Sequence, residues 1–369
     1  MKVLYISNFR DGTGWSNAAL GYILSMDAVG INVVPRAIKL NNVQGEVPDR
    51  IVELESQDDN GCDIVIQNVL PPFMEYSGKF AKNIGLCYTE TNSLGVTKWA
   101  DHLNLMDENW VCCKANAKCL TNSGVKTPIT VLPCPCDMSK YEQVYEPIPI
   151  PEIKDKFTFY YIGEISRRKN VVAMMKAFHL AFRRTDDVAL VIKGNIPGAS
   201  PQETGQQITD LANMVKDNLK LYPHRHQYMN EVIISAPMSN EEIMRLHSTC
   251  DCFVMPSFGE AWSIPTFDSM AMGKTPICNC TGGMLDFVRH GGWMVKNHQE
   301  PCFGDLDTIP DLHTGHEQWD AIDIEDLVRS MREAYHSLPT RLEKSACGID
   351  NAYQYSYVNV GQQILKALQ

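Results

Sequence analysis

The stretch from residue 254 to residue 283 reads VMPSFGEAWSIPTFDSMAMGKTPICNCTGG and carries the clearest fold signal of the sequence. It starts with the end of an apolar strand, continues through a glycine-containing loop that carries Glu260, and enters a helix at Pro265. Asp268 follows Glu260 by eight residues, so one carboxylate lies in the loop and the other inside the helix. The first turn of a helix leaves its backbone N–H groups unpaired, and these groups are suited to bind a phosphate.

Short apolar runs and helical patterns alternate on both sides of this stretch, which predicts an α/β protein with doubly wound parallel sheets. The strands are expected at residues 3–7, 32–35, 63–67, 83–88, 109–112, 130–132, 157–163, 188–193, 231–235, 252–255 and 275–278. The helices are expected at residues 16–29, 98–106, 114–123, 171–184, 204–220, 241–248 and 266–272.

The length of 369 residues predicts two domains, expected at residues 1–150 and 151–349. The proline-rich segment EPIPIPE at 146–152 separates them and is typical of a stiff linker. The final amphipathic stretch, roughly residues 342–368, is expected to pack back on the first domain with a C-terminal helix at about 350–369.

Composition and charge exclude several classes of protein. The chain is 44% hydrophobic and 21% charged, which is ordinary for a globular protein. No run approaches the ~18 apolar residues of a membrane span. The start, MKVLYISNFR, reads as a first strand and not as a signal peptide, so we expect a cytoplasmic protein.

The net charge of −11 argues against a basic nucleic-acid domain, although it does not exclude a local basic groove. The 13 cysteines lack the spacing of a zinc site, so no metal is expected.

Two further turns could bind ligands. The segment NFRDGTGWS at 8–16 follows the first strand, and Gly12 and Gly14 let a ligand approach the backbone there. Asn17 stands where a dinucleotide fingerprint needs a third glycine, which disfavours dinucleotide binding. The segment GEISRRKN at 163–170 ends another strand, and its cations suit a diphosphate. Either segment on its own could equally be a plain solvated turn.

Residues 254–283 resemble the signature of the retaining GT-B glycosyltransferases, the large glycosyl transferases group 1 family (family 4). That signature is a Glu, seven residues, a second Glu, then A-x-G-x-P-V/I and a later G-G. The matching residues here are Glu260, Asp268, Ala271, Gly273, Pro276, Ile277, Gly282 and Gly283. Residues 88–113, 123–137 and 160–170 resemble other segments of the same family.

The resemblance implies a GT-B fold, in which two Rossmann-like domains face a central cleft, and sugar transfer from a nucleotide diphosphate sugar to an acceptor hydroxyl with retention. It implies a donor site in which Glu260 contacts the sugar, Asp268 the ribose, and Lys169 with Arg167 or Arg168 the diphosphate. It also implies donor contacts from the turn and the helix start, at Gly163, Trp262, Ser263 and Ile264. On the acceptor side it implies Gly12, Gly14 and, more weakly, Glu90. No cofactor and no metal are implied besides the donor substrate.

Two residues depart from the family pattern. Asp268 replaces the second Glu and is one methylene shorter, and Glu164 stands where a phosphate-binding Arg is usual. A carboxylate beside a diphosphate is unfavourable, so we expect a neighbouring arginine to replace that Arg.

Other functions stay open from the sequence. A nucleotide-sugar epimerase or phosphorylase could share this fold. A glycosyltransferase acting on modified nucleic-acid bases would bind DNA in a salt-dependent way. A catalytically silent nucleotide-sugar-binding module would bind the donor without releasing nucleoside diphosphate. The acceptor itself, whether a glycan, a lipid-linked molecule or a nucleic-acid base, is not named by any motif, and neither is the oligomeric state.

Overall fold

The computed structural model describes residues 1–39, 45–95, 97–302 and 314–369. The chain divides into two compact units. Unit 1 comprises Met1–Lys140, Pro301–Gln318 and Tyr353–Gln369, and unit 2 comprises Tyr141–Glu300 and Trp319–Ala352. Unit 1 thus takes in two later segments besides the N-terminal one. The expected ranges 1–150 and 151–349 stay predictions.

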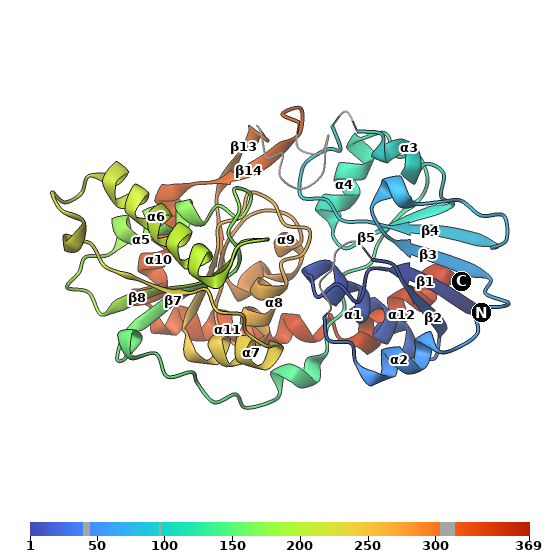
Figure 1. The fold of residues 1–369 in the computed structure, drawn as a ribbon, viewed down its shortest axis with the longest axis horizontal. Helices are drawn as coiled ribbons and strands as arrows, with labels where there is room; N and C mark the ends of the chain where they lie inside the picture. The colour runs from blue at the N-terminus through green and yellow to red at the C-terminus, as the bar shows by residue number, and fades with distance from the viewer. Residues whose placement is uncertain (40–44, 96, 303–313) are drawn as a thin grey trace. The chain divides into compact units, whose positions relative to one another are not determined.

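Unit 1 is built on a six-stranded parallel sheet in the order β2-β1-β3-β4-β5-β6 (Figure 1). Its strands are β1 (Lys2–Ser7), β2 (Asn32–Ala37), β3 (Ile64–Asn68), β4 (Lys82–Leu86), β5 (Glu108–Val111) and β6 (Ile129–Val131). Its helices are α1 (Gly14–Ala28), α2 (Asp49–Glu55), α3 (Trp99–Leu103), α4 (Lys114–Asn122) and α12 (Tyr357–Leu368). Short 3₁₀ helices follow at η1 (Pro71–Phe73) and at η2 (Met138–Tyr141), whose last residue already belongs to unit 2.

The last helix of the chain packs against the first. In Figure 1 the blue α1 and the red α12 lie side by side. The Ser25 hydroxyl donates a hydrogen bond to the Tyr357 carbonyl, at 2.9 Å. Gly361 permits this close approach, because a Cβ there would lie 2.3 Å from the Ser25 carbonyl oxygen. The preceding helix, α11 (Leu338–Tyr353), ends before it, and Ser356 caps the new helix by accepting from the Asn359 amide.

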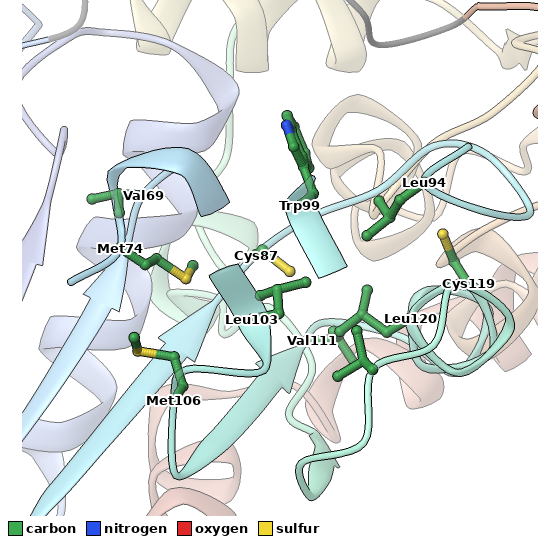
Figure 2. Packing of buried hydrophobic residues seen from close by; sticks show 11 residues of the cluster. Val69, Met74, Cys87, Leu94, Trp99, Leu103, Met106, Val111, Cys119 and Leu120 are labelled. Carbon is green, nitrogen blue, oxygen red and sulfur yellow. The ribbon is translucent and has the colours of Figure 1, made fainter. Parts of the chain in front are cut away.

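The core of unit 1 contains cysteine as an ordinary apolar residue. Figure 2 shows Cys87 and Cys119 packed with leucine, valine and methionine side chains and with Trp99. Burial raises the pKa of the Cys119 thiol to about 11, so it stays protonated and apolar at neutral pH. All 13 cysteines lie in the described residues, and each is a free thiol.

Unit 2 repeats the architecture with a sheet in the order β12-β11-β10-β7-β8-β9. Its strands are β7 (Phe157–Glu164), β8 (Val188–Asn195), β9 (Glu231–Ile234), β10 (Cys252–Met255), β11 (Ile277–Asn279) and β12 (Trp293–Val295), and β13 (Asn297–Pro301) pairs separately with β14 (Gln318–Ile322). Its helices are α5 (Val171–Ala181), α6 (Pro201–Leu219), α7 (Asn240–Thr249), α8 (Ile264–Ala271), α9 (Met284–Phe287), α10 (Ile324–His336) and most of α11. The 3₁₀ helices are η3 (Pro151–Ile153), η4 (Arg225–Gln227) and η5 (Arg289–Gly291).

Local signals explain where the helices of unit 2 begin. Ser200 caps α6 and Ser239 caps α7, each in a capping box with the glutamate three residues later. One expected helix end was wrong, and one helix was not predicted. The helix expected to reach residue 184 ends at Ala181, because Phe182 is already extended. Helix α2 was not expected, because its seven residues, DRIVELE, are too few to give a clear period.

The proline-rich segment is not a detached linker. Arg245 of α7 donates to the Glu146 carbonyl at 2.9 Å, and the Ile148 amide donates to the Thr249 hydroxyl at 2.7 Å. The segment is therefore fastened to the same helix at two points.

Candidate functional site

The loops that follow β7 and β10 meet at the carboxyl end of the unit 2 sheet. The Lys169 ammonium lies 2.6 Å from Glu260 Oε1, and Arg168 Nη1 lies 3.3 Å from the same oxygen. Arg168 also donates to the Gly259 carbonyl, at 2.7 Å. Ligands of open α/β sheets bind at this edge. The structure thus brings together two of the three cations and the acid that the sequence singled out.

Glu260 is an anion at neutral pH although its side chain is buried. Burial by itself would raise its pKa. The charges of Lys169 and Arg168, with the hydrogen bond from Lys169, outweigh burial and hold the pKa of Glu260 below its ordinary value. Two cations face one carboxylate here, so the cluster keeps an excess of positive charge.

Hydrogen bonds join the loop that follows β7 to the loop that follows β10. The Phe258 amide donates to the Arg168 carbonyl at 2.8 Å, and the Ser257 hydroxyl donates to the same carbonyl at 3.1 Å. On the other side, the Gly283 amide donates to the Glu260 carbonyl at 3.2 Å. Gly282 has a φ of +55°, and a Cβ there would lie 1.6 Å from the Glu260 carbonyl oxygen. The two glycines that end the signature therefore support the Glu260 loop.

Helix α8 starts beside this loop without a side-chain cap. It begins at Ile264, after Ser263 in the left-handed region, and Pro265 occupies its first turn. The Ser263 hydroxyl is instead bonded to that of Thr266, at 2.7 Å. The Trp262 side chain lies in the core, with its ring 4.9 Å from that of Phe287. Only the backbone of Trp262 is therefore available to contact a ligand. The half-buried Ile264 is the first residue of the helix.

Asp268 lies one turn further along α8 and is also buried. The hydroxyl of Tyr141 donates a hydrogen bond to Asp268 Oδ1, with the two oxygens 2.5 Å apart. The rings of Tyr141 and Phe267 are 6.2 Å apart. Tyr141 was missed in the sequence, because the two residues are 127 positions apart and no local pattern joins them.

Arg167 does not join the Glu260 cluster. It is exposed, and its guanidinium lies 5.4 Å from the centre of the Trp319 ring, which stacks on Phe258 at 4.6 Å. Glu164 ends β7, and the Tyr161 hydroxyl donates to its carbonyl oxygen at 2.7 Å. That hydroxyl also fills the space beside Gly163, where a Cβ would come within 2.7 Å of it.

Lys193 is a second residue that the sequence did not single out. It lies near the carboxyl end of β8, paired in register with Ile162 of β7, and is only 7% exposed. Burial lowers its pKa. Within residues 1–39, 45–95, 97–302 and 314–369, its ammonium has no ion pair and no hydrogen bond. Lys193 therefore lies toward the same edge of the sheet as the loop after β7 that carries Arg168 and Lys169.

Unit 1 carries its own polar cluster at the carboxyl ends of its strands. Gly14 begins α1, and the following Trp15 donates from its indole to Asn68 Oδ1, at 2.5 Å. Asn68 in turn donates to the Tyr88 hydroxyl at 3.1 Å, and the Trp15 and Tyr88 rings meet edge to face at 5.0 Å. Gly12, with a φ of +64°, precedes this helix, and Glu90 follows Tyr88 in the segment after β4. Trp15 could have been noticed in the sequence, since it lies inside the glycine turn.

Neither a metal centre nor a membrane helix is found in the part of the chain that the structure describes. No three His, Cys, Asp or Glu side chains there are grouped so as to hold a metal ion. None of the described helices has the length and apolar character needed to cross a bilayer.

Residues 146–302 match the family model described as glycosyl transferases group 1. The chain is 25% identical over 162 residues to the uncharacterized glycosyltransferase YqgM of Bacillus subtilis. The aligned residues cover 44% of this chain and 39% of that protein. It is 27% identical over 158 residues to sucrose synthase 1 of Tulipa gesneriana. The aligned residues cover 41% of this chain and 18% of that protein. The chain thus matches well under half of the length of these relatives.

Solved structures match the fold over the whole chain. Sucrose-phosphate synthase from Thermosynechococcus elongatus matches with a TM-score of 0.66 at 13% identity, over 100% of this chain and 98% of that one. HepE of Anabaena, in complex with UDP and glucose, matches with a TM-score of 0.66 at 13% identity, over 100% of this chain and 99% of that one. A trehalose-6-phosphate protein of E. coli bound with UDP-2-fluoro glucose matches with a TM-score of 0.69 at 10% sequence identity. This match covers 100% of this chain and 99% of that one. The chain therefore has the two-domain α/β fold called GT-B, and its residues 146–302 match the model of the glycosyl transferases group 1 family.

Proposed function

We propose that this protein transfers a sugar from a nucleotide diphosphate sugar to an acceptor hydroxyl, with retention of the anomeric configuration and without a metal ion. The observation that carries the proposal is the buried cluster of Glu260 with Lys169 and Arg168 at the carboxyl edge of the unit 2 sheet, inside the segment that matches the family. Proteins of the same fold were solved with UDP or UDP-glucose, which supports a nucleotide diphosphate donor.

The charge of the cluster suits a diphosphate leaving group. When the bond between sugar and phosphate breaks, negative charge grows on the leaving phosphate, and preorganised donors at that point lower the barrier. Lys169 and Arg168 are held in place by Glu260 and Gly259, so they need little reorganisation during the reaction. The uncapped start of α8, at Ser263 and Ile264, would add backbone amides to the same phosphate.

Each remaining site residue has a proposed role. Glu260 would contact the transferred sugar and Asp268 the donor ribose, while Gly163 leaves room at the turn that precedes the cations. In unit 1, Gly12, Gly14 and Glu90 would line the acceptor side. Arg167 is a weaker candidate than Arg168, because its guanidinium lies over Trp319. We further propose a reducing compartment such as the cytoplasm, since all 13 cysteines are free thiols and most are buried.

A donor and acceptor screen tests this proposal. Purified protein is incubated with nucleotide sugars and a panel of glycan, lipid-linked and nucleic-acid acceptors, and released nucleoside diphosphate is measured. We expect release with at least one pair, and an NMR spectrum of the product that shows the anomeric configuration of the donor.

The matched variant is Glu260→Gln, which keeps the size of the side chain and removes its charge. We expect transfer to fall about 10²-fold or more, the scale of losing one transition-state contact. Binding of nucleoside diphosphate should persist, because both cations remain, and it is followed by thermal shift. Glu241→Gln, on the exposed start of α7, is the control and should behave as wild type. Donor binding without any release would instead favour a silent binding module.

A further inference from the structure

Lys193 is a buried lysine near the carboxyl end of β8. It is 7% exposed, and burial lowers its pKa without a contribution from any neighbouring charge. Across the residues that the structure describes, its ammonium takes part in no ion pair and no hydrogen bond. Folded proteins rarely leave a buried charge in this state, because it loses its hydration and gains nothing in return. A group from outside the chain is therefore the natural partner of this ammonium.

The register of the sheet shows on which face the Lys193 side chain lies. Lys193 is paired with Ile162 of β7, and paired residues of neighbouring strands point to the same face. Tyr160 precedes Ile162 by two residues and shares its face, and its hydroxyl is bonded to His247 of α7 at 2.7 Å. Lys193 thus lies on the face that α7 covers. A lysine with a buried stem keeps its ammonium at the surface that remains, which here is the carboxyl edge, since β8 ends at Asn195.

The chain itself occupies the β11 side of the Glu260 loop. Cβ atoms on Gly282 and Gly283, in the segment after β11, would lie 1.6 Å from the Glu260 carbonyl oxygen and 2.5 Å from that of Ala261. On the other side of β10 lie β7 and then β8. A donor whose diphosphate binds Lys169 can therefore extend its nucleoside toward β8, which is one strand spacing, about 4.8 Å, from β7.

An ammonium distinguishes the bases of nucleotides by their exocyclic groups. It has three N–H donors and no acceptor, so it binds a carbonyl oxygen and is not satisfied by an amino group. Uracil and guanine carry a carbonyl oxygen, O4 and O6, where cytosine and adenine carry an amino group. A site built around a buried donor discriminates against a ligand that leaves this donor unpaired.

We propose that Lys193 is a base-specificity residue of the donor site, whose ammonium donates a hydrogen bond to the exocyclic carbonyl oxygen of uracil or guanine. The donor is then a uridine or guanosine diphosphate sugar, and cytidine and adenosine diphosphate sugars bind poorly. The bond gives the buried ammonium the partner that it lacks in the free protein, so no existing bond has to break. This inference rests on the proposed function, since it takes a nucleotide donor to bind at the carboxyl edge of unit 2.

The experiment compares different bases on the same diphosphate. Isothermal titration calorimetry measures the dissociation constants of uridine, cytidine, guanosine and adenosine diphosphate and of inorganic pyrophosphate. The base ratio is the affinity of uridine over cytidine diphosphate, or of guanosine over adenosine diphosphate, whichever pair binds more tightly. For the wild type we expect a base ratio of about 10 to 10², the range for one hydrogen bond to a charged group.

Lys193→Met keeps most of the length of the side chain and removes its ammonium. We expect the base ratio to fall below about threefold, while pyrophosphate binds as in the wild type because Lys169 and Arg168 remain. The melting temperature should not fall, because a buried charge without a partner is removed. Lys193→Gln offers both a donor and an acceptor, so it should accommodate the amino bases and also lower the base ratio.

The matched control is Lys154→Met, which changes an exposed lysine before β7 and should keep the wild-type base ratio. If the base ratio survives in Lys193→Met, or if the wild type binds all four diphosphates equally, the inference is overturned. An equal loss of pyrophosphate and of all four diphosphates in Lys193→Met assigns the ammonium to a phosphate and also overturns it. If the wild type binds none of the four diphosphates, the proposed function itself is wrong. Lys193→Gln supplies the comparison if Lys193→Met does not fold.

Discussion

The Lys169 ammonium and the Glu260 carboxylate lie 2.6 Å apart, although 91 residues separate them in the chain. Both side chains are more than four-fifths buried, so little water competes for this ion pair. A buried pair of this kind gains little stability over an apolar pair, because both charges lose their hydration. Its position at the edge where open α/β sheets bind ligands is the ground for its proposed role in binding and catalysis.

Replacing Lys169 should affect catalysis more than folding. In Lys169→Ala the diphosphate loses one cation, and we expect transfer to fall about 10²-fold or more. Arg168 stays beside Glu260, so the free energy of unfolding should fall by only about 1–3 kcal/mol. Lys169→Arg keeps the charge and should retain part of the activity. Steady-state rates and urea denaturation measure both quantities, and near-wild-type turnover of Lys169→Ala would remove Lys169 from the site.

The two neighbouring arginines should differ. Arg168→Ala removes the side chain that bonds to Gly259 and Glu260, and we expect kcat/KM to fall about 10²-fold. Arg167→Ala removes a contact with the Trp319 ring, which is worth about 0.5–1 kcal/mol at an exposed site, and kcat/KM should fall less than about fivefold. The variants are compared at the same donor concentrations. An equal or larger loss in Arg167→Ala would reverse the assignment.

Gly282 should not tolerate a side chain. In Gly282→Ala the new Cβ would overlap the Glu260 carbonyl oxygen, and the φ of +55° is unfavourable for alanine. We expect the Glu260 loop to move and activity to fall by at least about tenfold, because catalytic groups depend on precise placement. Gly14→Ala is a useful comparison for folding, since no atom lies within 4 Å of the Cβ it would add. If Gly282→Ala is as active as the wild type, the loop does not depend on this close contact.

A buried ion network should make the stability of unit 2 depend on pH. Glu231 of β9 bonds to His179 at 2.7 Å and to Lys216 at 2.6 Å. Burial by itself would raise the pKa of Glu231, but the bonds and charges of His179 and Lys216 outweigh it and lower the pKa below 4.5. The folded-state pKa is lower than the unfolded one, so this stabilisation is complete above the unfolded pKa and is lost as the pH falls through the folded pKa.

Glu231→Gln tests this pH dependence. At neutral pH we expect the variant to be about 3–5 kcal/mol less stable, because Lys216 and His179 lose their buried partner. On acidification below about pH 4.5 the wild type should lose stability faster, so that the two proteins converge. Urea denaturation at a series of pH values measures the difference. A difference that stays constant into the acid range would show that the Glu231 carboxylate is not ionised in the folded protein.

Much of the site could be predicted because its parts are local. The loop and helix that carry Glu260 and Asp268 follow each other directly, and the strand before them, 252–255, was predicted with the bounds of β10. The cations at 167–169 were found because they follow a strand and precede a helix. The sequence could not distinguish Arg168 from Arg167, because neighbouring residues in a turn point in different directions. The structure shows that Arg168 bonds to Gly259 while Arg167 lies over the Trp319 ring.

The alternation of strands and helices and the position of the signature follow from local sequence, because hydrophobic period, helix caps and glycines act within a few residues. Local sequence does not show which distant groups meet. Tyr141 reaches Asp268, and Lys193 is buried near the carboxyl end of its strand, because the order of strands in a sheet and the burial of charge depend on contacts between segments far apart in the chain.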